Sequence, residues 1–244
     1  MRAVVQTGYG KPSEVLEVGE LDRPPVGDGQ VLVRVRASSV HPDVWHVVMG
    51  LPRVLRMMGS GLRRPRDVVP GTDMAGQVES VGSRVTRFGP GDEVFGETLR
   101  GMQWRNGGAY AEYVVVDEDA LALKPSNVTF EQAATVPTSG LITLQNLPDL
   151  GRRPGGQRVL VNGAGGGVGA MAVQLARSSG AHSRPSITPA SSTCSEPSAQ
   201  IGSSTTRPTT SHEVRSATTS CSTWWAITRS RRTDASSRPT APTC

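Results

Sequence analysis

The sequence predicts a β-rich domain, followed by the opening part of an α/β domain and then a disordered tail. Short apolar segments separated by glycine and proline recur as far as residue 126, which is typical of antiparallel β-structure. A strand, a glycine-rich turn and a helix then follow in residues 156–181. After His182 the composition changes abruptly. The 244 residues suffice for one large domain or two smaller ones.

The β-rich region contains segments that cluster or alternate β-branched residues, as strands do: 2–7, 15–20 and 30–40. In the last of these, alternate valines from Val31 onward share one face, and Arg34 and Arg36 point to water. Residues 51–67 differ, because five arginines surround a few apolar residues. We expect a solvated loop with a helical turn there, and no binding patch.

The pattern becomes helical after residue 126. Asn127 or Thr129 is the expected N-cap, with Glu131 and Gln132 in the first turn. A second helical run follows in residues 138–150. The helix after the glycine turn carries apolar residues spaced for packing on a sheet and is expected to end at Gly180: Met171, Val173, Leu175 and Ala176.

The segment 183–244 is predicted to be disordered. It contains 15 Ser and 13 Thr and has no Leu, Phe, Tyr or Met, so it cannot bury enough apolar surface to offset the entropy of ordering. Its net charge of +4 makes up most of the +5 of the chain, and its arginines are scattered. The charge therefore does not indicate a nucleic-acid partner.

Cysteine usage and hydropathy exclude several classes of protein. All the cysteines lie in the tail, which excludes a disulfide framework and a cysteine-based zinc site from the rest of the chain: Cys194, Cys221 and Cys244. No apolar run has the length of a signal peptide or a membrane span. We therefore expect a cytoplasmic protein with no membrane partner.

Four ordered motifs carry a resemblance to a known family: "PGTDMAGQVESVGSRVTRFGPGDEVFG", "GGAYAEYVVV", "EQAATVPTSGLITLQNL" and "VLVNGAGGGVGAMAVQLA". Over residues 1–182 the chain resembles the medium-chain dehydrogenase/reductase superfamily, specifically its zinc-independent quinone oxidoreductase branch. The resemblance implies a GroES-like catalytic domain over 1–126, the start of a Rossmann domain over 127–182, and a tail over 183–244. It also implies hydride transfer from NADPH or NADH to a quinone or an activated alkene.

The resemblance assigns the cofactor site to the glycine-rich turn. Glycines let the backbone approach a pyrophosphate, and the following helix N-terminus supplies N–H donors. The A-x-G-x-x-G pattern falls on Ala164, Gly166 and Gly169, and the alternative G-x-G-x-x-A register ends on Ala170. The predicted cofactor-binding residues are Asn162, Ala164, Gly165, Gly166, Gly167, Val168 and Gly169.

Three residues are candidates for the catalytic site. His41 replaces an Asn usual in the branch, and it either hydrogen-bonds a carbonyl, relays a proton or is a loop histidine bonded to backbone. Trp45, together with Asp43, is expected to line the same pocket, whereas His46 is expected to face solvent. Thr138 lies where family members place a residue near the nicotinamide, and a helix-capping hydroxyl is its alternative role.

No metal is expected. In zinc-dependent relatives a Cys stands at the position of His41, and a His and a Glu stand at the positions of Thr72 and Asp73. In this chain His41 and Asp73 could bind a metal, but the sequence offers no third soft ligand beside them.

Two alternatives to the quinone reductase interpretation stay open. One is a relative of the zinc-type alcohol dehydrogenases. Another is a non-catalytic GroES-like binding module whose basic tail contacts an acidic partner. Relatives are often homodimers, and the sequence leaves the oligomeric state open.

The second strand of the cofactor domain is expected directly after residues 178–182, with a residue at its end that selects the ribose. That position holds Ile187 in a serine-rich segment. We interpret the segment after His182 as read out of frame. When the reading frame is restored, the pattern of polar and apolar residues becomes that of further α/β units. The chain is accordingly expected to be a truncated and inactive reductase.

Overall fold

The computed structural model describes residues 1–54, 56–99, 104–147, 158–186 and 227–230. They fall into two compact units, Met1–Leu141 and Ile142–Cys244, which are considered separately. The division lies inside the helix α4 (Pro137–Asn146). The helix α3 (Phe130–Ala134), which follows the predicted boundary at residue 126, packs on the first unit.

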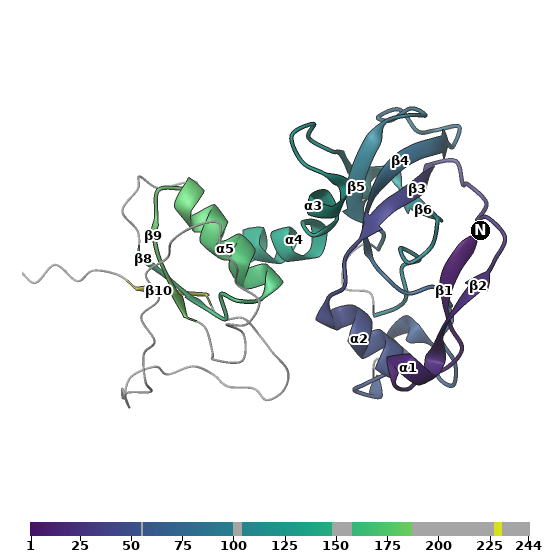
Figure 1. Ribbon diagram of the computed structural model, residues 1–244, viewed down its shortest axis with the longest axis horizontal. Helices are drawn as coiled ribbons and strands as arrows, with labels where there is room; N and C mark the ends of the chain where they lie inside the picture. Colours follow the sequence, from purple (N-terminus) through teal and green to yellow (C-terminus); the bar gives the residue numbers. More distant parts are fainter. Residues whose placement is uncertain (55, 100–103, 148–157, 187–226, 231–244) are drawn as a thin grey trace, which may run out of the picture. The chain divides into compact units, whose positions relative to one another are not determined.

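The first unit is built on an antiparallel sheet of five strands in the order β6-β3-β4-β5-β7 (Figure 1). The strands are β3 (Gln30–Ser38), β4 (Asp73–Val81), β5 (Glu93–Glu97), β6 (Tyr113–Asp117) and β7 (Leu121–Leu123). A separate antiparallel pair is formed by β1 (Arg2–Gln6) and β2 (Leu16–Glu20). These strands confirm the β-rich character predicted for this half of the chain.

The alternation predicted for β3 determines which of its side chains enter the core. Val31 and Val33 are fully buried, while Arg34 and Arg36 are exposed. Leu32 on the other face is also buried, so both faces of this central strand are covered at its start. The core of the sheet contains Val31, Val33, Met74, Val78, Val94 and Val116.

Helical segments lie between these strands. The helix α1 (Pro12–Val15) follows the first strand, and α2 (Pro42–Met49) follows β3 with His41 as N-cap. Gly50 ends α2 with a φ of 61°, a left-handed conformation that glycine adopts without strain. A π-helical turn at Arg56–Ser60 supplies the helical turn predicted within residues 51–67, and a 3-10 turn occupies Glu118–Ala120.

Thr129 is the N-cap of α3. Its hydroxyl accepts a hydrogen bond from the backbone of Gln132, and the Gln132 side chain accepts one from the backbone of Thr129. This reciprocal capping box decides between the two predicted caps in favour of Thr129. It fixes α3 so that Ala133 and Ala134 pack against Ala75 of the sheet.

The second unit contains the predicted strand, turn and helix. The strand β8 (Arg158–Asn162) runs into α5 (Gly167–Ser178), whose residues Ala172, Val173 and Ala176 pack on Val159 and Val161. Gly180 follows the helix with a φ of 71°, as expected of a terminating glycine.

Two short strands border β8. On one side β9 (His182–Ser186) pairs parallel with it, and on the other β10 (Ile227–Ser230) pairs antiparallel. The expectation of disorder from residue 183 onward is therefore wrong for 183–186 and 227–230, because backbone pairing with β8 orders them. The rest of the predicted tail, 187–226 and 231–244, lies outside the described residues.

The capping box gives a testable prediction. Replacing Thr129 by Ala removes the hydroxyl acceptor of the box, so the free energy of unfolding is expected to fall by about 1 kcal/mol. Thr86→Ala is the control, because this exposed threonine makes no side-chain hydrogen bond within the described residues. Urea denaturation measures both variants, and equal losses would contradict the capping role.

Candidate functional site

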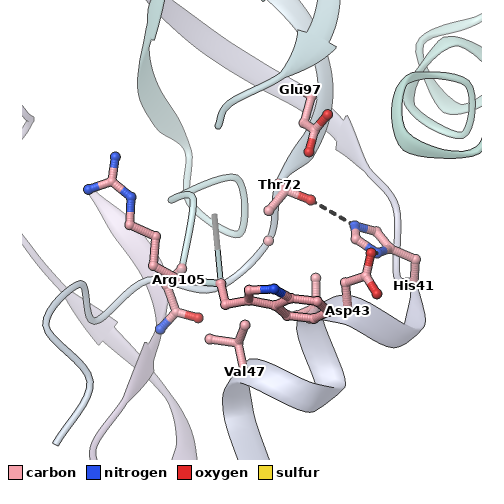
Figure 2. A pocket seen from close by; sticks show the side chains of 10 residues that line it. His41, Asp43, Val47, Thr72, Glu97 and Arg105 are labelled. Carbon is pink, nitrogen blue, oxygen red and sulfur yellow. Dashed lines mark hydrogen bonds and ion pairs between the residues drawn. The ribbon is translucent and has the colours of Figure 1, made fainter. Parts of the chain in front are cut away.

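A small cleft lies in the first unit, between the N-terminus of α2, the segment just before β4 and the end of β5. Its volume is about 90 Å³, well below the roughly 300 Å³ and more of typical ligand pockets, so it has room for a functional group but not for a whole ring system. Figure 2 shows His41, Asp43, Thr72 and Glu97 around the same hollow. The lining residues are His41, Asp43, Val44, Val47, Gly71, Thr72, Glu97, Trp104, Arg105 and Asn106.

His41 is held in one orientation at the edge of this cleft. Its Nε2 atom forms a hydrogen bond of 2.7 Å with the Thr72 hydroxyl, and its side chain is only 12% exposed. The buried Nδ1 atom lies 3.8 Å from a carboxylate oxygen of Asp43 and makes no hydrogen bond within the described residues. The histidine is thus bonded to a side chain that lines the cleft, and not to backbone.

Asp73, next to Thr72 in the chain, is a buried carboxylate bonded to two other segments. Its Oδ1 accepts a hydrogen bond of 2.6 Å from the Thr138 hydroxyl, and its Oδ2 accepts bonds from the Thr138 backbone N–H and the Ser39 hydroxyl. Burial raises the pKa of Asp73, and the bonds from Thr138 and the charge of His41 oppose that rise. Thr138 therefore uses its hydroxyl on Asp73, and this bond replaces the capping role considered from the sequence.

Glu97 is the most perturbed carboxyl group in the cleft. Burial raises its pKa from the ordinary value of 4.5 to about 7, and the charges of Asp73 and Asp43 act in the same direction. Asp73 is its partner across β4 and β5, which explains their proximity. A carboxyl group with this pKa exists in both protonation states near neutral pH, as a proton donor or acceptor requires.

The tryptophan in the cleft is not the predicted one. Trp45 is 47% exposed on α2 and does not line the cleft, whereas Trp104 does. His46, expected to face solvent, lies between the two indole rings, with centroids 5.0 Å from Trp45 and 6.4 Å from Trp104. Asp43 lines the cleft as expected. The local sequence around Trp104 has no periodicity that indicates which way its ring points.

Close backbone packing shapes the floor of the cleft. Gly71 has a φ of 87°, and a Cβ atom there would overlap the ring of Tyr110. Tyr110 donates a hydrogen bond of 3.0 Å to the carbonyl of Ser39, and burial, together with the charge of Asp73, raises its pKa to about 12. Tyr110 thus remains a neutral phenol that positions the segment preceding His41.

The glycine-rich turn of the second unit has the backbone geometry that phosphate binding needs. Gly163 has a φ of 80°, and Gly166 is the N-cap of α5 with no side chain to cap the helix. The first N–H groups of α5 thus have neither intrahelical acceptors nor a side-chain cap. At Gly169 a Cβ atom would overlap the backbone of Gly163 and Ala164, so only glycine permits this close turn.

The other predicted cofactor-binding residues lie in the same turn. Asn162 ends β8, and Gly165 lies between Gly163 and the N-cap. Gly167 and Val168 form the first turn of α5, and the carbonyl of Val168 accepts a hydrogen bond from Thr143 of α4. All seven residues predicted for the cofactor are therefore brought together within one strand, turn and helix.

The described part of the chain contains no group of three or more His, Cys, Asp or Glu residues placed to hold a metal ion. None of its helices combines the length and apolar character needed to cross a bilayer.

Residues 27–126 match the alcohol dehydrogenase GroES-like domain family. The Quinone-oxidoreductase homolog, chloroplastic, of Spinacia oleracea is 33% identical over 187 residues, covering 75% of this chain and 54% of the relative. The quinone oxidoreductase of Mus musculus is 31% identical over 181 residues, covering 74% and 50%. The quinone oxidoreductase structure from Coxiella burnetii has a TM-score of 0.66 at 30% identity, covering 78% of this chain and 57% of that chain.

Over about three quarters of its length the chain is similar to quinone oxidoreductases of the medium-chain dehydrogenase/reductase superfamily. Its ancestry is that of an oxidoreductase. It has the GroES-like domain of the superfamily and an incomplete Rossmann domain, which includes the strand, turn and helix of the second unit. The chain spans about half the length of the curated relatives that it matches.

The bond between Thr138 and Asp73 gives a second prediction. Thr138→Val keeps the shape of the side chain but leaves a buried carboxylate oxygen without its donor, so the free energy of unfolding is expected to fall by about 1–3 kcal/mol. Thr138→Ser retains the hydroxyl and is expected to cost less than about 1 kcal/mol. Chemical denaturation of both variants decides the matter, and a serine variant as unstable as the valine variant would contradict the assigned bond.

The raised pKa of Glu97 gives a third prediction. Because the folded protein holds this proton more tightly than the unfolded chain, the stabilisation is complete below pH 4.5 and is lost as the pH rises toward 7. Glu97→Gln removes this pH dependence. As the pH rises from 5 to 8, the free energy of unfolding of the variant is therefore expected to increase by about 1 kcal/mol relative to that of the parent protein, because partial solvent exposure of Glu97 reduces the effect to this size. Denaturation at both pH values measures the gain. Glu17→Gln, an exposed substitution outside the cleft, is the control and is expected to show none.

Proposed function

We propose that this chain descends from, and retains the site of, an NAD(P)H-dependent reductase that transfers a hydride to a quinone or an activated alkene. The observation that carries the proposal is the uncapped glycine turn at the start of α5, in a chain similar to quinone oxidoreductases. The names of relatives support this substrate class: they include quinone oxidoreductases and the 2-methylene-furan-3-one reductase of Solanum lycopersicum.

The glycine turn would hold the pyrophosphate of the dinucleotide. The free N–H groups of Gly167 and Val168 point out of the helix N-terminus, where the helix dipole favours an anion. Gly169 supports this arrangement because its missing side chain lets the turn pack directly on the helix. When bound, the nicotinamide supplies the hydride, and the chain itself supplies binding and polarisation.

The cleft of the first unit would hold the carbonyl end of the substrate. The hydroxyl of Thr72 lines the cleft and is bonded to Nε2 of His41, so a hydrogen bond from Thr72 to a substrate oxygen can be supported by the histidine behind it. Protonated Glu97 is available on the same cleft to deliver the proton that follows the hydride. We propose no zinc in this step.

We further propose that the present chain binds dinucleotide weakly and turns over slowly. In a Rossmann domain the crevice lies at the carboxyl ends of neighbouring parallel strands. Here β10 runs antiparallel to β8, so its carboxyl end lies at the opposite edge of the sheet. On the other side β9 ends at Ser186, with no acidic residue within the strand to bind the ribose hydroxyls.

The test is an assay of the whole chain with NADPH or NADH and 1,4-naphthoquinone, with the mouse quinone oxidoreductase as positive control. Turnover is expected below about 0.1 s⁻¹, since enzymes commonly reach about 1 s⁻¹ or more, and the dissociation constant for NADPH is expected near or above about 1 mM. Turnover at an ordinary enzymatic rate would refute the low activity. Oxidation of an alcohol with NAD⁺ and Zn²⁺, without quinone reduction, would refute the reductase assignment.

A further inference from the structure

A basic segment of the first unit remains unexplained by the reductase site. We call residues 51–66 the arginine loop. The chain has no acidic residue between Asp43 and Asp67, and the arginine loop carries five arginines in that interval. In Figure 1 the arginine loop lies beside α1 and α2.

The arginine loop is anchored to the body of the unit along its inner side. The hydroxyl of Tyr9 donates a hydrogen bond of 2.6 Å to the carbonyl of Gly61. Arg56 stacks over the Tyr9 ring at 4.4 Å and donates a bond to the carbonyl of Gly50. Ser60 donates a hydrogen bond to the carbonyl of Trp104. These contacts fix the base of the loop, so its outer side chains are presented on a supported surface.

The outer side chains are both apolar and cationic. Met57 is 76% exposed, Leu62 67% and Val54 53%, which is unusual for three large apolar residues within nine positions. The exposed arginines of the same loop form no ion pair within the described residues: Arg53, Arg63, Arg64 and Arg66. Neither the apolar surface nor the positive charge is matched by a partner in the described part of the unit.

This combination fits an anionic lipid surface. Arginine binds phosphate oxygens through its planar fork of N–H donors, and exposed apolar side chains between the cations gain free energy by entering the headgroup region. Nucleic acid fits less well, because single strands need aromatic stacking platforms and a duplex offers nothing to the three apolar side chains. Trp45, half exposed on the neighbouring helix α2, adds a residue type typical of membrane interfaces.

We infer that the arginine loop docks this protein peripherally on membranes rich in anionic phospholipid. The inference differs from the sequence-based expectation of a solvated loop and of no membrane partner. It does not depend on the proposed reductase function, and a protein without any turnover would still bind vesicles. Contact at the surface is all that is required, with the arginines against the phosphates and Met57 and Leu62 at the level of the headgroups.

The test is sedimentation of the whole chain with vesicles of pure phosphatidylcholine and with vesicles containing one third phosphatidylglycerol. Binding is expected only to the anionic vesicles and is expected to weaken as salt rises. The double variant Arg63→Gln/Arg64→Gln should bind roughly 30-fold more weakly, because each basic residue at such a surface contributes on the order of 1 kcal/mol. Its matched control is Arg34→Gln/Arg36→Gln, which removes the same charge from the exposed face of β3 and should retain binding within about 3-fold.

A second variant separates lipid docking from a general charge effect. Leu62→Asn keeps every arginine and is expected to weaken vesicle binding several-fold while circular dichroism and the denaturation midpoint stay unchanged. Equal losses of vesicle affinity in the two double variants would overturn the inference. Binding would then depend on the total positive charge and not on the arginine loop, and the cations of residues 183–244, which all variants share, would contribute to it equally. The inference would also be overturned if the chain bound neither kind of vesicle, or if it bound duplex DNA through Arg63 and Arg64 but no vesicle.

Discussion

The buried carboxylate of Asp73 is the interaction on which the first unit depends. It lies at the start of β4 and is bonded to Ser39, which precedes His41, and to both the backbone and the hydroxyl of Thr138 at the start of α4. A buried charge is costly unless hydrogen bonds satisfy it, so the surrounding segments are held where they can donate. Thr72, the residue immediately before Asp73, carries the hydroxyl that lines the cleft. The same strand end thus fixes the architecture and places the chemistry.

The carboxylates around the cleft also set its proton affinity. Glu97 lies across the sheet from Asp73 and within the field of Asp43, and both charges favour the protonated form of Glu97. His41 offsets part of this negative charge. The cleft therefore combines a group that can give up a proton near neutral pH with a hydroxyl that a histidine supports, although neither feature is sufficient for hydride transfer without a bound dinucleotide.

The second unit has the start of a nucleotide site and an unusual sheet around it. The turn from Gly163 to Gly169 has the positive φ, the absent side-chain cap and the close packing that a pyrophosphate requires. A complete crevice also needs neighbouring parallel strands, and β10 runs in the opposite direction. This contrast between an intact turn and an altered sheet is the reason for expecting weak dinucleotide binding in a chain that resembles reductases.

The sequence by itself determined the features that depend on local chemistry: the alternating strand β3, a helix cap at Asn127 or Thr129, the terminating glycine of α5 and the glycine turn, since propensity and backbone freedom act over a few residues. Only the tertiary structure decided that Trp104 and not Trp45 lines the cleft, that Glu97 belongs to it, and that Thr138 binds Asp73. Those contacts join residues far apart in the chain, and no periodicity encodes them. The pairing of β10 with β8 was hidden for the same reason, because a composition that predicts disorder cannot reveal which strand edge a short segment will meet.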